Sequence, residues 1–146
     1  IALERFSTHF NFEPMVFDTA DEQGSPIYHT PVLMCVATEF ALVGFDTFTD
    51  PRRAEEVRLR LEESGRDVID LSNLQIKEFA GNAIELSGRD GRILALSRRA
   101  FNSLTAEQCQ RIERSARLVP LDVPTIEMAG GSVRCMIAGI HLSPRR

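Results

Sequence analysis

The chain has 146 residues, of which 43% are hydrophobic and 26% are charged, and its formal net charge is -4 at pH 7. A chain of this size buries roughly two-thirds of the surface that its unfolded form exposes, and its composition is ordinary for one soluble globular domain, which we take to be residues 1–146. The basic residues are scattered, which excludes the positive patch of a nucleic-acid-binding protein. No apolar run approaches the roughly 20 residues that cross a bilayer, so we expect no membrane partner and a cytoplasmic location.

The three cysteines, Cys35, Cys109 and Cys135, are widely spaced and form no C-x-x-C pair. An odd number at such spacing argues against a disulfide framework, a zinc site or a redox motif, and leaves at least one thiol free. Cys35 lies in an apolar run and Cys109 in a predicted helix, where each is expected to be a small packed hydrophobe. Residues 1–6 read as the end of an amphipathic helix without an initiator Met, so we expect further sequence to precede them.

The first half of the chain predicts strands and one helix in a definite order. Short apolar or alternating runs predict strands at residues 12–17, 32–36, 40–44 and 68–71, and a turn region at 18–26. A helix begins after Asp50, the predicted N-cap, with Pro51 at its first position, and Gly65 ends it. After the turn region the order is therefore strand, strand, helix, strand, which predicts an α/β fold.

The same order returns in the second half of the chain. Strands are predicted at residues 83–86, 92–96 and 118–121, a helix at about 105–116, and the opening strand of a third unit at 136–140. Thr105 and Gln108 form a capping-box pattern, which places the start of that helix. The chain thus consists of repeated strand-strand-helix-strand units.

One polar or reactive side chain precedes the first strand of each unit: His29, then Asn82, then Cys135. The same interval, 53 residues, separates His29 from Asn82 and Asn82 from Cys135. Units related by rotation about an axis would bring these equivalent positions together at the axis. The interval by itself leaves an alternative open, namely coincidence between a satisfied buried His and a structural Cys.

The local sequence around Cys135 favours catalysis over that alternative. The pair Gly130-Gly131 lets the backbone approach a ligand without an intervening side chain, which a purely structural Cys does not need. The neighbouring Arg134, or His29 when it is protonated, would raise the thiolate fraction of Cys135. A Cys and a His together form the pair that nucleophilic catalysis requires, because imidazole takes or supplies the proton.

The remaining polar candidates are weaker. Asn82 follows Phe79-Ala80-Gly81, and its side-chain amide offers both a donor and an acceptor. We expect it to contact substrate, with capping of the strand entry as the alternative. His9 and His141 lie near the two ends of the chain and are expected to be bystanders.

Three segments resemble the amidinotransferase and arginine deiminase superfamily, and within it the bacterial citrulline hydrolases. They are Tyr28-His29-Thr30 with residues 32–35, Phe79-Ala80-Gly81-Asn82 with Glu85-Leu86, and the most specific of the three, Gly130-Gly131-Ser132-Val133-Arg134-Cys135-Met136. The resemblance runs over nearly the whole chain. It implies the pentein fold, a five-fold pseudosymmetric α/β propeller with the active site on its axis, of which this chain would be the C-terminal half. Pro31, Ala83 and Ala129 depart from the pattern, since relatives usually carry Asn, Met and Gly there.

The resemblance implies a C–N hydrolase that acts on a ureido or guanidino amino acid such as citrulline. The Cys135 thiolate would attack the central carbon, and His29 would protonate the departing amine and then activate water, with no metal or organic cofactor. Asn82, Gly131 and Arg134 are the expected substrate-binding residues. The substrate-gripping carboxylates of the family come mostly from the N-terminal half, so an arginine deiminase, an amidinotransferase and a non-catalytic pentein binding protein remain alternatives. An open propeller segment is also expected to associate with itself or with that half.

Overall fold

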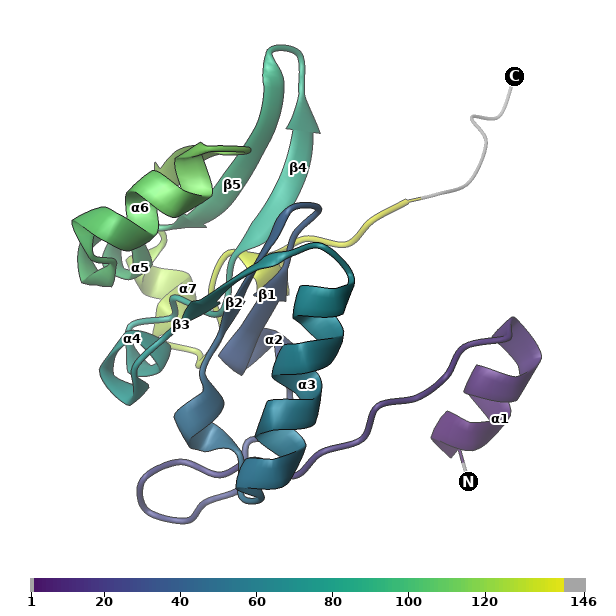
Figure 1. Cartoon of the computed structure of the whole chain (residues 1–146). Helices are drawn as coiled ribbons and strands as arrows, with labels where there is room; N and C mark the ends of the chain where they lie inside the picture. The colour runs from purple at the N-terminus through teal and green to yellow at the C-terminus, as the bar shows by residue number, and fades with distance from the viewer. Residues whose placement is uncertain (1, 141–146) are drawn as a thin grey trace.

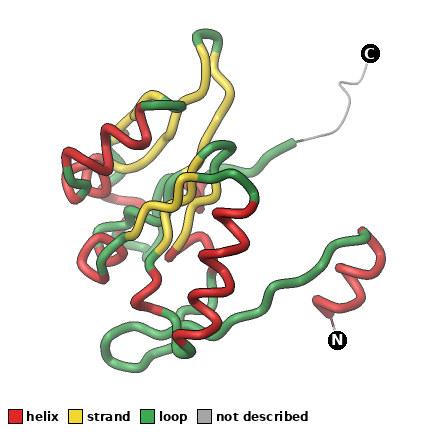
Figure 2. The backbone as a smooth tube through the Cα atoms, in the orientation of Figure 1, coloured by secondary structure: helices red, strands yellow, loops and turns green. Residues whose placement is uncertain are grey.

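The structure, a computed structural model, describes residues 2–140 and contains two three-stranded sheets flanked by helices (Figure 1). The strand orders are β1-β2-β3 and β4-β5-β6. In each sheet the first two strands are antiparallel, and the third is parallel to the second. The two sheets therefore have the same topology, which confirms the predicted strand-strand-helix-strand repeat. Figure 2 shows the strands of the two units side by side, with the helices outside them.

The first unit is built from three strands, one long helix and short helical turns. Its elements are α2 (Thr30–Leu33), β1 (Met34–Val36), β2 (Phe40–Val43), η1 (Phe45–Thr47), α3 (Pro51–Glu63), β3 (Asp67–Asp70) and α4 (Asn73–Lys77). The predicted start of α3 is confirmed, because the Asp50 carboxylate accepts a hydrogen bond from the Arg52 amide at 2.9 Å. Gly65 follows the helix with φ of +83°, a left-handed conformation that glycine adopts without a steric penalty.

The second unit repeats this order with a longer hairpin. Its elements are β4 (Ile84–Gly88), β5 (Gly91–Ser97), α5 (Arg98–Ser103), α6 (Ala106–Glu113), β6 (Arg117–Leu121) and α7 (Pro124–Glu127). The capping box of α6 is present, since the Gln108 amide N–H donates to Thr105 Oγ1 at 3.2 Å and the Thr105 N–H donates to Gln108 Oε1 at 2.9 Å. The ends of the chain add α1 (Ala2–Phe10), which stands away from the body in Figure 1, and η2 (Arg134–Met136).

Three predicted strands differ from the structure. Residues 12–17 are extended without a hydrogen-bonded partner strand among the described residues; Pro14 lacks an N–H, and Phe12 and Val16 are exposed. Residues 32–36 begin as the helical turn α2, which Pro31 favours at its first positions, and only then become β1. Met136 is the last residue of η2, and residues 137–140 are in no strand, because no strand within residues 2–140 pairs with them.

One hydrophobic core joins the two units. Leu42 and Ile69 in the first sheet and Leu94 in the second are fully buried, and α3 and α6 each cover their sheet with one buried side chain, Val57 and Ile112. Burying a side chain of this size contributes about 1.5–3 kcal/mol, so the interior stabilises the pair of units as one body. None of the helices within residues 2–140 is both long and apolar enough to cross a membrane.

Candidate active site

Cys135 lies in η2 at the end of a tightly held loop. Gly130 turns the chain with φ of +90°, and the next residues are buried: Ser132 and Val133 have no exposed surface. The Ser132 hydroxyl donates to Glu127 Oε1 at 2.9 Å, which ties the loop to α7, and the Cys135 N–H donates to the Ser132 carbonyl at 3.1 Å. Cys135 itself is exposed. The loop therefore presents an exposed cysteine from a hydrogen-bonded backbone.

Asn82 is the residue that fixes this loop to the rest of the protein. Its side chain is 1% exposed. Its Oδ1 accepts hydrogen bonds from the backbone N–H groups of Ser132 at 3.0 Å and Cys135 at 3.4 Å. Its Nδ2 donates to the Pro31 carbonyl at 2.8 Å and to the Cys135 sulfur at 3.1 Å. The predicted convergence of Asn82 and Cys135 is thus confirmed, and the Asn82 amide joins residues from three successive units.

The turn that delivers Asn82 explains the small residues before it. Phe79 has φ of +64°, which is uncommon for a bulky residue and reverses the chain after α4. A Cβ atom on Gly81 would lie 2.6 Å from the Val32 carbonyl oxygen and 2.7 Å from the Leu33 carbonyl carbon. Since both are backbone atoms, only glycine lets the second unit approach the first this closely.

His29 lies at the N-cap position of α2, with an exposed side chain whose ring is 4.7 Å from the ring of Tyr28. Its carbonyl accepts a hydrogen bond from the Val32 N–H at 2.9 Å, and the Pro31 carbonyl two residues later is held by Asn82. The His29 backbone is therefore anchored to the same amide as Cys135. Among the described residues no hydrogen bond joins the imidazole to Cys135, and pairing of the two side chains stays a prediction.

Gly131 and Arg134 flank the nucleophile. A Cβ on Gly131 would lie 3.1 Å from the Cys135 Cβ and 3.4 Å from its sulfur, so the glycine leaves free the space beside the sulfur. The Arg134 guanidinium donates to the Ile137 carbonyl at 3.2 Å, and its N–H group donates to the Asn82 carbonyl at 3.2 Å. Gly131 borders the sulfur and Arg134 adjoins Cys135 in the chain, and contact of either with substrate stays a prediction.

The other two thiols have different surroundings. Burial raises the pKa of the Cys35 thiol to about 12, helped by the Glu85 carboxylate and opposed by Arg134. Burial also raises the pKa of Cys109, which is partly buried against the core. Thiols with raised pKa values carry little thiolate at neutral pH and react slowly. Both therefore match the packed, unreactive role that the sequence predicts.

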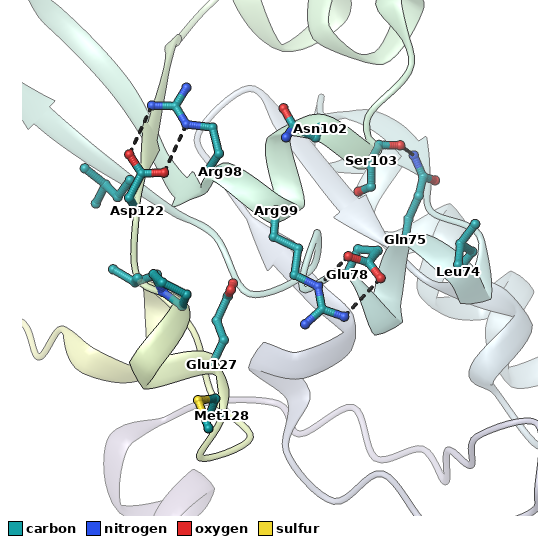
Figure 3. Close-up of a pocket in the computed structure, with 13 residues that line it drawn as sticks. Leu74, Gln75, Glu78, Arg98, Arg99, Asn102, Ser103, Asp122, Glu127 and Met128 are labelled. Atoms are coloured by element: carbon teal, nitrogen blue, oxygen red, sulfur yellow. Dashed lines mark hydrogen bonds and ion pairs between the residues drawn. The ribbon is translucent and has the colours of Figure 1, made fainter.

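A separate open cleft of about 880 Å³ lies between α4, α5 and α7 (Figure 3). Arg99 pairs with Glu78 on one side of it, and Arg98 pairs with Asp122 at 3.2 Å on the other. Its apolar rim includes Leu74 and Met128, which are 67% and 88% exposed. The cleft does not contain Cys135, so we do not assign the chemistry to it.

The sequence profile of one protein family, described as N,N dimethylarginine dimethylhydrolase, eukaryotic, matches residues 1–142. The chain belongs to this family. The predicted relation to this superfamily is therefore confirmed at the level of the family. The predicted similarity to citrulline hydrolases in particular stays a prediction. None of the curated protein sequences matches the chain significantly.

The fold of this dimethylarginine dimethylhydrolase family member is similar to that of ArgZ, an arginine dihydrolase from the ornithine-ammonia cycle in cyanobacteria. The apo structure of ArgZ gives a TM-score of 0.68 at 16% identity, over 90% of this chain and 19% of ArgZ. Its N-terminal domain bound to product gives 0.66 at 18% identity, over 90% of this chain and 44% of that domain. A variant of that domain covalently bound to a reaction intermediate gives 0.66 at 18% identity, with the same shares covered. The chain thus spans less than half of each of these solved chains.

Several residues of the site were not found from the sequence. The Pro31 carbonyl, the Ser132 side chain and Glu127 all hold the nucleophile loop, and only the fold brings them together. Residue type gives no signal for such contacts, although the glycines at 81 and 131 mark where backbones come close. His141 lies outside the described residues. Within residues 2–140, no three His, Cys, Asp or Glu side chains are grouped so that they could hold a metal ion.

Proposed function

We propose that this protein is a cysteine-dependent hydrolase that cleaves a C–N bond of a guanidino or ureido amino acid. The observation that carries the proposal is the sulfur of the exposed residue Cys135, held 3.1 Å from the buried Asn82 amide at the end of a hydrogen-bonded loop. A purely structural Cys has no need of such a support. Membership of the dimethylarginine dimethylhydrolase family supports the same chemistry.

In the proposed reaction the Cys135 thiolate attacks the central carbon of the substrate and forms a covalent adduct. His29, protonated, gives its proton to the departing amine, so that the C–N bond breaks with a neutral leaving group. The neutral imidazole then takes a proton from water, and the resulting hydroxide attacks the adduct and releases the thiolate. Gly131 and Asn82, which lie beside the sulfur, and Arg134, which precedes Cys135 in the chain, are the residues of this chain proposed to shape the substrate site.

Three candidate substrates have support, each from a different comparison. An N-methylated arginine follows from the family's description, arginine from the likeness to ArgZ, and citrulline from the resemblance of the sequence motifs. All three present a planar carbon bonded to nitrogen at the end of an amino acid. We rank N-methylated arginine first because the family match covers residues 1–142.

The test is turnover by the complete protein with dimethylarginine, arginine and citrulline offered separately, followed by release of amine or ammonia. We expect release from at least one substrate, its loss in Cys135→Ala, and a roughly 100-fold to 10,000-fold lower rate in His29→Ala, the usual contribution of a positioned acid-base group. Wild-type turnover in Cys135→Ala would rule out the covalent mechanism. Binding of these compounds without any turnover would favour the alternative of a non-catalytic pentein binding protein.

The five-fold propeller and its assembly belong to the same proposal. Between the two units described, Gln75 in α4 is 7% exposed and its amide donates to the Ser103 carbonyl at 2.8 Å and to Gln108 Oε1 at 2.7 Å. Met128, at the end of α7, is 53 residues after Gln75 and so occupies the equivalent position of the repeat. In contrast to Gln75, it is 88% exposed. We propose that a further unit of the same repeat, from sequence outside this chain, packs on α7 as the second unit packs on α4.

A cytoplasmic location completes the proposal. The three cysteines are free, with no disulfide among them. Unpaired thiols are most easily maintained in a reducing compartment, which supports the cytoplasm over a secreted location.

A further inference from the structure

We propose that Asn82 is a catalytic residue, which donates a hydrogen bond to the Cys135 sulfur and holds it as a thiolate. The catalytic role of Asn82 rests on the proposed hydrolase function, whereas its effect on the Cys135 thiol does not. Asn82 was selected from the sequence as a substrate contact or a strand cap. The structure places its amide in the wall behind the nucleophile, 1% exposed, with all four of its hydrogen-bonding contacts made to the protein.

The orientation of the Asn82 amide follows from its neighbours. Two of them, the N–H groups of Ser132 and Cys135, can only donate, so the amide oxygen must face them at 3.0 and 3.4 Å. A third neighbour, the Pro31 carbonyl at 2.8 Å, can only accept, so the amide nitrogen must face it. A flipped amide would oppose donor to donor and acceptor to acceptor, with buried groups left unpaired.

With this orientation fixed, the second hydrogen of Nδ2 has one described acceptor, the Cys135 sulfur at 3.1 Å. A thiolate accepts a hydrogen bond far better than a thiol does, and charge-assisted hydrogen bonds are roughly twice as strong as neutral ones. A hydrogen bond to the charged form of a group favours that form. The buried amide therefore favours the reactive thiolate even though Cys135 itself is exposed to solvent.

The proton balance leaves Asn82 unchanged. When the thiolate forms, the thiol proton goes to the His29 imidazole or to solvent water, and Asn82 keeps both amide hydrogens. The hydrogen bond to sulfur weakens when the thiolate forms its bond to the substrate carbon, and it is restored when the adduct is hydrolysed. Asn82 thus supports the nucleophile between turnovers, and its contacts with Pro31 and Ser132 keep the sulfur in place.

The experiment measures the pH dependence of Cys135 alkylation by iodoacetamide in the complete protein without substrate, with peptide mass mapping to separate the three thiols. Asn82→Asp keeps the size and the acceptor oxygen but replaces the donor by a negative group. We expect the pH of half-maximal alkylation to rise by at least about one unit, which makes Cys135 about tenfold slower at neutral pH. Gln75→Glu is the matched control, because it changes another buried amide between the units that has no contact with Cys135.

Unchanged alkylation of Cys135 in a folded Asn82→Asp variant would overturn the proposal. An equal shift in Gln75→Glu would also overturn it, since the effect would then be general loosening of the fold. If Asn82→Asp does not fold, Asn82→Ala takes its place, because it removes the donor to the sulfur without adding a charge. A raised pH of half-maximal Cys135 alkylation in that variant supports the proposal, and an unchanged one refutes it. A shifted profile in a protein that turns over no substrate would leave the effect on the thiolate standing and remove only the proposed function.

Discussion

At the scale of single residues, the site depends on two kinds of position that differ in what they tolerate. Asn82 is specific in its chemistry, because its donors and acceptors meet fixed backbone partners. Gly81 is specific in its size, because any side chain would meet the backbone of the first unit. The two are adjacent, so a change at Gly81 should act on the site through Asn82.

We therefore predict that Gly81→Ala destabilises the fold by about 1–3 kcal/mol, the usual cost of an added group in a space without room. Its Cβ would lie 2.6 Å from the Val32 carbonyl oxygen, which cannot rotate away as a side chain could. The same shift should move Asn82 away from Cys135 and slow its alkylation. Urea unfolding and iodoacetamide labelling measure the two effects.

Gly65→Ala serves as the control for that variant. No atom lies within 4 Å of the added Cβ, and the cost comes only from the φ of +83°. A left-handed conformation costs an L-residue roughly 1–2 kcal/mol, so this variant should also lose stability. Its Cys135 alkylation should match the wild type. Equal alkylation in Gly81→Ala and wild type would contradict the coupling between Gly81 and the site.

At the scale of elements, the two units are joined by polar contacts as well as by the core. Arg111 in α6 reaches back to β3, where its guanidinium binds the Asp67 carboxylate and donates to the Val68 carbonyl at 2.8 Å. The hydrogen bond from Arg111 is the largest effect and lowers the pKa of Asp67. Burial, the next largest, opposes it, and the charges of Arg111 and Arg114 lower the pKa further. The pair therefore stabilises the junction only while Asp67 is ionised.

The sign of the pH dependence follows from this shift. A carboxyl whose pKa is lower in the folded state than in the unfolded state adds stability above its unfolded pKa, and that stability is lost as the pH falls through its folded pKa. We predict that Asp67→Asn lowers the free energy of unfolding at pH 7 by about 1 kcal/mol or less. The effect is small because water screens the partly exposed Asp67–Arg111 pair. The difference should fall as the pH is lowered from about 5 through the folded pKa, which lies below 3.8.

The measurement is urea unfolding of both proteins at matched pH values. Carboxyl groups elsewhere titrate in both proteins, so their contribution cancels in the difference. A difference between the two proteins that stays constant from pH 7 to pH 3 would show that Asp67 acts by packing and not by charge.

At the scale of the whole molecule, α4 and α7 occupy equivalent places in the two units but have different surroundings. The residue after α7 that corresponds to buried Gln75 is Met128, and Ile126 beside it is 38% exposed. Adjacent apolar side chains at the end of a repeat array indicate a face on which another unit packs. The exposed apolar rim of the cleft in Figure 3 belongs to the same face.

We predict that the 146-residue chain by itself self-associates, because this face then has no other unit to cover it. Met128→Glu should reduce the association, since a charge on an apolar contact is costly to bury. Leu59→Glu is the control, because Leu59 is 47% exposed but lies on α3, away from α7. Sedimentation velocity at several concentrations measures the effect, and a monomer at every concentration in the unsubstituted chain would contradict the prediction.

Much of the architecture could be predicted from the sequence, because local patterns determine it. The N-cap at Asp50, the capping box at Thr105 and the period of the apolar residues place the starts of α3 and α6 and most strands within about two residues. The two predicted strands that are absent, at residues 12–17 and 136–140, have no partner strand in the described part of the chain. Pairing is a property of the whole fold, and a short alternating run cannot show whether a partner strand exists.

The sequence by itself determined the repeat and pointed to His29, Asn82 and Cys135. The 53-residue interval and the pair Gly130-Gly131 can be read directly from the order of the residues. Only the tertiary structure decided what Asn82 does, since its partners, Pro31 and Ser132, lie about 50 residues away in each direction. Hydrogen bonds from one side chain to distant backbone groups depend on how the units pack, and residue type does not encode them. The apolar run around Cys35 predicted a packed thiol, but only the folded chain supplies the burial, which raises the pKa of Cys35 to about 12 while Cys135 stays exposed.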